Sequence, residues 1–276
     1  MADGGGDWLS RTLVDLRKSA KLSQTAAAEA AHLGGPGAGQ VRLSRIETGT
    51  FVPSEEEVRS LCGAYRASPA MLALCVLWAA RDTRAEGISA RIILREAGEH
   101  QARLGAVEEV SREIRNWQPL LIPGLLQTDA YARAVFSDRL RGKAVDRAVA
   151  ARLARAHILD SDRQFTFVVS EGALRWSIGA AAMREQLAKL ADAATRYRFG
   201  VVPQASVADT IPQHGFGLFD DRLVVLGLRH GAELLGDSER VAEYVVWFAK
   251  LEALAVFGEQ ARQVIKSVAR SYRALL

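Results

Sequence analysis

The spacing of apolar residues changes along the 276-residue chain. In the first part, residues such as Leu9, Leu13 and Leu16 recur at the three- and four-residue intervals of an amphipathic helix. Later, short apolar runs typical of strands appear at 165–170, 199–202, 215–219 and 223–228. We therefore expect two domains: a helical domain over residues 1–82, a connector over 83–100, and a second domain over 101–276.

Capping signals delimit helices in the first domain. Ser54 followed by Glu57 has the spacing of a capping box, and Ser68-Pro69 supplies an N-cap and a first-turn proline. Together with the helical periodicity, these signals predict a compact bundle of about five helices in the first eighty-odd residues.

The second domain is expected to be α+β, with a small, mostly antiparallel sheet covered by helices. Its last two strands are expected to form a hairpin through Asp220-Asp221. The chain as a whole is therefore predicted to be mainly α. Helices are predicted over 107–117, from Thr128 or Asp129 onward, and over 144–159, 181–195, 238–257 and 260–272.

A pattern between Leu16 and Pro53 favours a helix-turn-helix. A first short helix opens at Leu22-Ser23-Gln24, and its alanines are small enough for a second helix to cross it closely. In that second helix, residues 40–49, Leu43 and Ile46 are expected to point inward. Arginine can read a guanine edge, glutamine an adenine edge, and a short apolar side chain a thymine methyl. The residues left on the outer face suit such a recognition helix: Gln40, Val41, Arg42 and Arg45.

This stretch resembles the phage-repressor-like (XRE) helix-turn-helix family. The resemblance implies that Arg17 pairs with Glu47, tying the first helix to the third, and that Gln24 contacts a DNA phosphate. The matching residues are Leu13, Leu16-Arg17, Leu22-Ser23-Gln24, Leu43-Ser44-Arg45-Ile46-Glu47-Thr48-Gly49 and Pro53. The predicted DNA-binding residues are Gln24, Gln40, Val41, Arg42, Ser44, Arg45 and Thr48.

Two features weaken the DNA-binding interpretation. The turn at residues 32–39 is about five residues longer than the tight turn of that family. It is either a solvated bulge or a displacement of Gln40 that leaves Arg42 and Arg45 as the principal readers. Residues 1–66 carry eight basic and eight acidic side chains, so charge alone fits a plain helical bundle with surface arginines. The ordered motif outweighs that alternative.

The run from Asn116 to Ala134 resembles the signature of WhiJ-like actinobacterial regulators, which place a repressor-type helix-turn-helix before a C-terminal domain of this length. The resemblance implies a repressor with a small protein partner. Where family members commonly show Tyr-Val-Glu, this chain has Leu226-Gly227-Leu228, so any role of that acid is absent. The match centres on Pro123-Gly124-Leu125-Leu126-Gln127-Thr128 and recurs at 151–155, 169–175, 183–187 and 201–203.

Most residues of this second motif are expected to be core structure, because two prolines fix an extended apolar segment that must be covered. A minority are candidates to line a pocket or a partner groove, since aromatic and arginine side chains dominate interface energetics. These candidates are Trp117, Tyr131, Glu171 and Arg175.

Catalysis is disfavoured, and no cofactor is expected. The sequence has no nucleophile elbow and no Gly-x-Gly-x-x-Gly after a strand, and His157, His214 and His230 lack metal-ligand spacing. Cys62 and Cys75 fall in apolar helical patterns, which disfavours a disulfide or zinc site. The longest uncharged apolar run, 70–80, is shorter than the roughly 20 residues that cross a bilayer. We expect a cytoplasmic, nucleoid-associated protein without a membrane partner.

These inferences predict a homodimeric transcriptional regulator, a repressor by default, that binds a palindromic double-stranded DNA operator. The second domain would dimerise and bind a small partner protein encoded nearby or another effector. The alternative is an antitoxin-like protein that autoregulates its operon. Two dimer surfaces are open: the arginine-rich helix 144–159 and the stripe Val241, Tyr244, Val245, Phe248 and Leu251.

Overall fold

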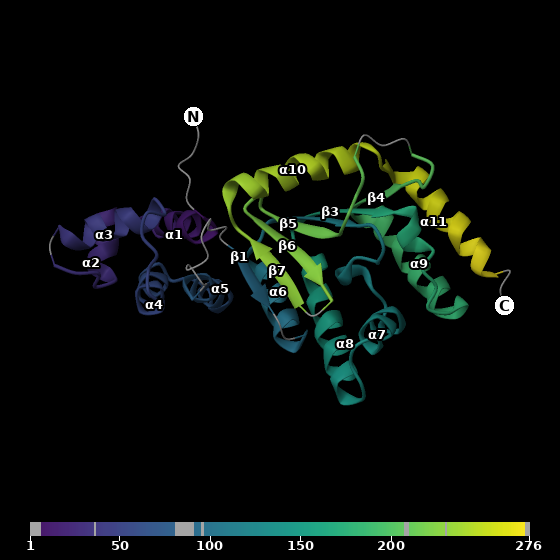
Figure 1. Cartoon of the computed structure of the whole chain (residues 1–276), viewed down its shortest axis with the longest axis horizontal. Helices are drawn as coiled ribbons and strands as arrows, with labels where there is room; N and C mark the ends of the chain where they lie inside the picture. Colours follow the sequence, from purple (N-terminus) through teal and green to yellow (C-terminus); the bar gives the residue numbers. More distant parts are fainter. Residues whose placement is uncertain are drawn as a thin grey trace. The chain divides into compact units, whose positions relative to one another are not determined.

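A computed structural model describes residues 7–35, 37–80, 91–94, 97–206, 210–229 and 231–273 (Figure 1). The chain divides into two compact units. The first comprises residues 1–93, 221–224 and 233–242, and the second comprises 94–220, 225–232 and 243–276. Most of the predicted connector, 83–100, lies outside the described residues. Within it, only strand β1 (Arg91–Leu94) and the first turn of helix α6 (Ala97–Val110) are described, so the predicted domain boundaries stay a prediction.

Five helices make up the N-terminal part of the first unit, as predicted. The capping box is present: Ser54 Oγ accepts from the Glu57 backbone N–H at 3.2 Å, and Glu57 Oε2 accepts from the Ser54 backbone N–H at 2.9 Å. Ser68 caps the fifth helix, which begins with Pro69. The helices, purple to blue in Figure 1, are α1 (Trp8–Ser19), α2 (Gln24–Ala30), α3 (Ala38–Glu47), α4 (Glu55–Ala64) and α5 (Pro69–Ala79).

The core of this bundle is aliphatic. Leu13 of α1, Leu43 and Ile46 of α3, and Val58 and Leu61 of α4 are all completely buried. The two buried residues of α3, and likewise those of α4, are three positions apart, so one face of each helix turns inward. The outer face of α3 is thereby left toward solvent.

Two tryptophans and a glycine pack tightly together in the first unit. The Trp8 and Trp78 rings stack with centroids 5.5 Å apart, and the Trp8 backbone N–H donates to the Gly236 carbonyl at 3.0 Å. A Cβ at Gly236 would lie 2.6 Å from both Trp8 Cβ and the Trp78 ring. Only glycine fits there without a shift of its neighbours, so segment 233–242 belongs to this unit by close packing.

The sheet is larger than predicted and mixed rather than small and mostly antiparallel. Among the described residues, eight strands have the order β1-β7-β6-β5-β2-β3-β4-β8. β2 (Glu113–Gln118) pairs in parallel with β3 (Gln164–Ser170), and β3 in parallel with β4 (Arg198–Val202). The antiparallel partner of β2 is β5 (Phe216–Phe219), and that of β4 is β8 (Val256–Phe257). The remaining strands are β6 (Leu223–Leu228) and β7 (Gly231–Leu235).

The parallel pairs follow from the helical connections. A parallel pair requires a crossover, because a tight turn can join only antiparallel strands. Helices α7 (Asp129–Ser137) and α8 (Lys143–Arg155) lie between β2 and β3, and α9 (Ala180–Arg196) lies between β3 and β4. Short 3-10 turns flank them at Gly124–Leu126, Ala156–Asp160 and Glu171–Leu174.

One predicted helix was wrong. Residues 107–117 divide into the end of α6 and the start of β2, a central strand of the sheet. The predicted strands at 165–170, 199–202, 215–219 and 223–228 correspond to β3, β4, β5 and β6. Asp220 and Asp221, between β5 and β6, both have φ of 52°, the left-handed conformation of a tight hairpin turn.

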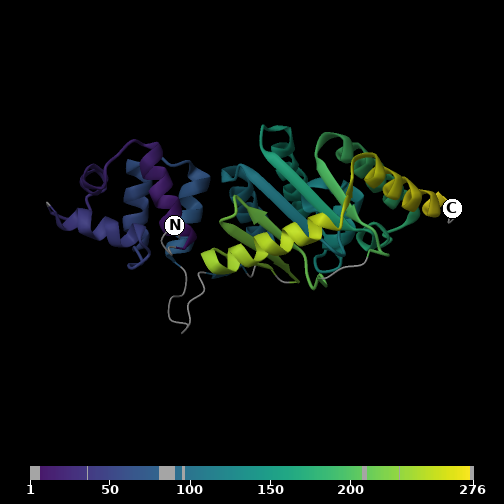
Figure 2. The same cartoon turned by 90° about the horizontal axis from the view of Figure 1, so that it is seen from above.

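Helices lie on both faces of the sheet in Figure 1, and Figure 2 again shows α10 (Ser238–Ala253) running along one of them. Within the second unit, α10 packs on β5 through aromatic rings: the Phe216 centroid lies 4.9 Å from that of Tyr244 and 5.2 Å from that of Trp247. Helices α9 and α11 (Gly258–Arg273) pack on each other and on β4. Helices α6 and α7 pack on α8.

The apolar stripe of α10 was one of the two predicted dimer surfaces. Val241, Phe248 and Leu251 are at most 1% exposed, so they belong to the core of the chain itself. That alternative was therefore wrong for the buried part of the stripe. Within the described residues, no helix combines the length and the apolar character needed to span a membrane.

Candidate nucleic-acid interface

Helices α2 and α3 cross closely because both present small side chains to each other. Ala27 is completely buried and Ala28 is 3% exposed. A Cβ at Gly39 would lie 3.3 Å from that of Ala28, which is tighter than ordinary packing. The predicted close crossing is thus built from alanine on one helix and glycine on the other.

The turn between these helices is long, as the sequence indicates. α2 ends at Ala30 and α3 begins at Ala38. Gly34 and Gly37 have φ of 137° and 79°, conformations that side chains disfavour, and Pro36 lies outside the described residues. Gly37 is the N-cap of α3 and makes no side-chain cap. The glycines therefore let the chain reverse before α3 starts.

The predicted pair between Arg17 and Glu47 is present in the structure. Arg17 Nε donates to Glu47 Oε1 at 2.6 Å and Arg17 NH2 donates to Oε2 at 2.9 Å. The two side chains are 13% and 5% exposed. Hydrogen bonding to Glu47 raises the pKa of Arg17 above its ordinary value. This bidentate pair fixes the C-terminal end of α3 to α1.

Gln24 and Gln40 extend the same network rather than standing free. Gln24 Nε2 donates to Glu47 Oε2 at 2.9 Å, and Gln40 Nε2 donates to Gln24 Oε1 at 2.9 Å. Each glutamine amide thus forms a hydrogen bond to a neighbouring side chain, and these bonds fix the orientation of both amides at the surface. Their DNA contacts stay a prediction.

Arg42 and Arg45 share one aromatic ring. The Arg42 guanidinium carbon lies 4.3 Å from the Phe51 ring centroid, and that of Arg45 lies 5.7 Å from it. Arg42 Nε also donates to Glu57 Oε1, which raises the pKa of Arg42. The terminal nitrogens of Arg42 make no hydrogen bond among the described residues, so they stay available to a ligand.

The rest of the outer face of α3 is open. Val41 is 57% exposed, Arg45 and Thr48 are exposed, and Ser44 is half-buried. Thr48 Oγ1 donates to the Arg45 carbonyl at 3.2 Å, so it closes the last turn of the helix. One helix face therefore brings together a methyl-bearing side chain and two arginines, the groups that read base edges in the major groove.

Sequence reasoning missed two residues of this surface. Phe51 lies four residues beyond Glu47, and it acts through ring contacts that no spacing rule specifies. Glu57 was recognised only as a capping residue, whereas one of its oxygens caps α4 and the other holds Arg42. Its position beside a predicted surface arginine becomes visible only in the folded bundle.

Two of the four predicted partner-binding residues are buried. Trp117, on β2, is completely buried, and Tyr131, on α7, is 1% exposed and accepts from the Ile122 backbone N–H at 3.3 Å. Neither side chain lines a partner groove at the surface, because β2 and α7 turn them into the core of the second unit. Arg175 pairs with Glu171 at the surface, and Glu171 Oε2 accepts from the Gln204 backbone N–H at 3.1 Å. A partner role for Glu171 and Arg175 stays a prediction.

No metal centre is formed within the part of the chain that the structure describes, since no three His, Cys, Asp or Glu side chains gather there in a metal-binding arrangement. Cys62 and Cys75 are both buried free thiols.

Comparisons with known proteins agree with a helix-turn-helix. Residues 8–74 match the family described as "Helix-turn-helix domain". The N-terminal region is thus a helix-turn-helix domain, which supports DNA-binding regulation. No curated protein matches the chain.

One solved structure that matches bears the description "Structure of TrmBL2, an archaeal chromatin protein, shows a novel mode of DNA binding". The match has 12% sequence identity and a TM-score of 0.34, and covers 63% of this chain and 55% of that one. The chain thus spans about half the length of that protein, and a likeness this weak carries no weight for its function. The WhiJ-like resemblance stays a prediction.

The family assignment of the whole chain rests on its second domain. Residues 101–267, more than half of its length, match the family described as "Domain of unknown function (DUF5753)". The chain therefore belongs to the DUF5753 family, with a helix-turn-helix domain preceding the family's domain.

Proposed function

We propose that this protein is a homodimeric, sequence-specific regulator of transcription, acting as a repressor, whose α3 enters the major groove of a palindromic operator. The observation that carries the proposal is the division of α3 into two faces. Its inner residues Leu43 and Ile46 are completely buried, whereas Val41 and Arg45 are exposed on the outer face. A recognition helix must be held rigidly on one side and remain open on the other.

The contacts around α3 support separate roles for its residues, some contacting bases and others the DNA backbone. Arg45 and the terminal nitrogens of Arg42 would donate to guanine edges, and Val41 would meet a thymine methyl. Phe51 limits the freedom of both arginines, so less conformational entropy is lost when they bind. Gln24, Gln40, Ser44 and Thr48 would contact the DNA backbone and set the register of the helix.

The homodimer follows from the need for affinity. A single short helix reads only a few base pairs, whereas two symmetric copies read two half-sites about one helical turn apart. The second unit would hold the copies together and receive an effector. A change in their relative orientation would then alter operator affinity without any change in α3.

Selection from a random double-stranded DNA pool tests this function. The full chain should enrich one palindromic motif, with half-sites separated by about 10 base pairs or a multiple of that spacing. A variant with Arg42→Ala and Arg45→Ala should not enrich the same motif. The matched control is Arg59→Ala, which removes an exposed arginine of the adjacent helix α4 and should enrich the wild-type motif. Failure of the wild-type chain to enrich any motif would contradict the proposal.

A further inference from the structure

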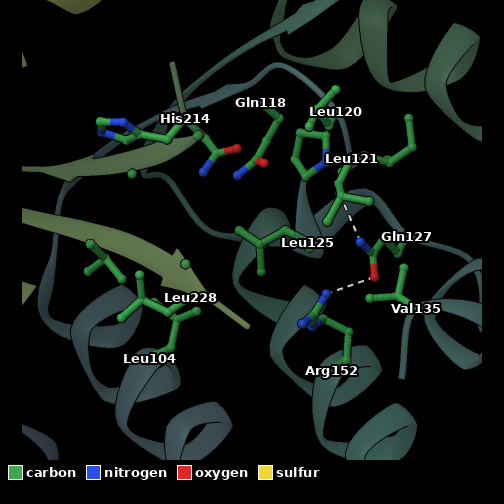
Figure 3. Close-up of a pocket in the computed structure, with 18 of the residues that line it drawn as sticks. Leu104, Gln118, Leu120, Leu121, Leu125, Gln127, Val135, Arg152, His214 and Leu228 are labelled. Carbon is green, nitrogen blue, oxygen red and sulfur yellow. Dashed lines mark hydrogen bonds between the residues drawn. The ribbon is translucent and has the colours of Figure 1, made fainter. Parts of the chain in front are cut away.

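A cavity of about 660 Å³ lies within the second unit. That volume is within the range of pockets that enclose small organic ligands. Its walls come from the sheet, from α6, α7 and α8, and from the segment between β2 and α7. Figure 3 shows Leu104, Leu125, Val135, Arg152 and Leu228 among the residues around it.

The sheet side of the cavity is shaped by the two-residue repeat of strands. Ile114, Asn116 and Gln118 of β2 line the cavity, whereas Arg115 between them lies over the Phe248 ring of α10, with its guanidinium carbon 5.4 Å from the centroid. On the neighbouring strand, Gly217 lines the cavity in place of a larger residue. A Cβ at Gly217 would lie 2.9 Å from the Phe219 ring, so glycine lets that ring, which also lines the cavity, pack against the strand.

A cation at the cavity wall, Arg152, makes its hydrogen bonds within the described part of the chain to neutral amides. Arg152 of α8 donates from Nε to Gln101 Oε1 at 3.0 Å and from NH1 to Gln127 Oε1 at 2.7 Å, and its guanidinium carbon lies 4.7 Å from the Phe136 centroid. Figure 3 shows the guanidinium directed toward Gln127. Among the described residues, no carboxylate pairs with Arg152.

The next arginine along α8 provides the contrast. Arg155 also lines the cavity, but Glu108 holds it in a buried bidentate pair, with Arg155 Nε donating to Glu108 Oε2 at 2.7 Å. Burial, followed by repulsion from Arg155, lowers the pKa of Arg152. An anion beside Arg152 would offset both effects.

The segment before α7 holds this cation in place. Gln127 Nε2 donates to the Ile122 carbonyl at 2.8 Å, so its oxygen is turned toward Arg152. A Cβ at Gly124 would lie 3.1 Å from Arg152 NH1. The Pro123–Thr128 motif therefore positions the guanidinium, and the lack of a side chain at Gly124 lets it lie close to the backbone.

The remainder of the cavity combines apolar and polar groups. Leu120, Leu121 and Leu228 line it and are 57%, 44% and 46% exposed, so apolar surface meets solvent there. Asn116 Oδ1 is buried and has no hydrogen-bond partner among the described residues, which leaves an acceptor for a ligand donor. Among the described lining residues, the arginines Arg139, Arg152, Arg155 and Arg229 outnumber the carboxylates Glu108 and Asp138 by two.

We propose that this cavity binds a small amphipathic anion, with a carboxylate or phosphate held by Arg152 and an apolar body against the leucines. The inference deepens the proposed function, because it gives the chemical class of the effector on which that function relies. Binding itself requires no DNA, so its failure is distinguishable from failure of operator recognition.

Fluorescence titration of the full chain with 1-anilinonaphthalene-8-sulfonate tests the proposal. The sulfonate of this dye stands in for the acid group, and its rings for the apolar body. We expect saturable binding at one site per chain. Octanoate and octyl phosphate should displace the dye, and whichever acts at lower concentration identifies the preferred acid group. Octanol and octylammonium should displace it at least tenfold less effectively.

Two variants separate a binding role of Arg152 from a structural one. Arg152→Met should weaken dye binding about ten- to hundredfold, the loss expected for a hydrogen bond to a charged group. The matched control Arg147→Met removes an exposed arginine of the same helix and should bind as the wild type does. Gly227→Trp should block the cavity, because Gly227 lines it and nothing lies within 4 Å of a Cβ placed there.

Near-ultraviolet circular dichroism verifies that each variant is folded. If Arg152→Met unfolds, dye binding by folded Gly227→Trp still tests whether the dye occupies the cavity. Absence of saturable dye binding would overturn the proposal. So would equal displacement by octanol or octylammonium, or unchanged binding in folded Arg152→Met and Gly227→Trp.

Discussion

The bidentate pair between Arg17 and Glu47 predicts a specific pattern of stability losses. In Glu47→Ala, three hydrogen bonds are lost: two from Arg17, and one from Gln24 Nε2. Removing one partner of a buried pair costs about 3–5 kcal/mol, because the other charge stays desolvated. Arg17 is 13% exposed and can be partly hydrated. We therefore expect the free energy of opening of the helical bundle to fall by about 2–4 kcal/mol.

Replacing both partners should be far less harmful. Arg17→Met combined with Glu47→Leu leaves no unpaired charge, so its opening free energy should lie within about 1 kcal/mol of the wild type. Native-state hydrogen exchange with mass spectrometry measures this in the full chain, with peptides from α1 and α3 as the reporters and peptides from β3 and α9 as the internal reference. Glu29→Ala, an exposed acid of α2, is the control. The reasoning would be refuted if Glu47→Ala lowered the opening free energy of the bundle no more than Glu29→Ala does. It would also be refuted if the double variant lost as much opening free energy as Glu47→Ala.

Three further predictions concern stability. Gly236→Ala should lower the opening free energy of the helical bundle by about 1–3 kcal/mol, since its Cβ would overlap Trp8 and Trp78; exchange of α1 peptides measures this, and an unchanged rate would contradict the packing. Gln186 is completely buried, accepts from the Thr128 backbone N–H and donates to the Leu126 carbonyl, both at 2.8 Å. Gln186→Leu should therefore lower the free energy of unfolding of the second unit, measured in urea, by about 2–4 kcal/mol. The exposed control Arg184→Ala should lower it by less than about 0.5 kcal/mol. Burial lowers the pKa of His214, so the unfolded chain takes up this proton at higher pH than the folded chain does. Stability of the second unit should fall as pH drops through about 6.5, and His214→Gln should reduce that fall between pH 7.5 and 5.5; an identical pH dependence in both proteins would rule out His214 as its source.

Local signals in the sequence predicted the parts of the fold that local physics determines. Ser54 and Ser68 mark helix starts because their hydroxyls bond backbone N–H groups within one turn. Strand β3 was recognisable because its apolar side chains are buried on both faces of the sheet. Asp220 and Asp221 are turn residues that tolerate positive φ.

Strand β2 escaped prediction because its sequence serves the cavity as well as the sheet. Asn116 and Gln118 face the cavity, so the apolar alternation of a central strand is broken. The same reason hid the cavity: Arg152, Gln101 and Gln127 come from three separate segments, and no sequence spacing brings them together. At the candidate DNA surface, the resemblance predicted the pairing of Arg17 with Glu47, whereas the ring of Phe51 beneath two arginines required the folded structure.

The specificity of DNA binding by arginine variants tests the central claim most directly. Fluorescence anisotropy at one salt concentration would compare the selected operator with a scrambled duplex. Arg45→Ala and Arg42→Ala should each weaken operator binding by about 1–3 kcal/mol and leave binding to the scrambled duplex almost unchanged, because each removes a base contact. Gln24→Ala should weaken both duplexes alike, and Arg59→Ala should leave the operator preference intact. Equal losses on both duplexes for Arg42→Ala and Arg45→Ala would contradict the assignment of α3 as the recognition helix.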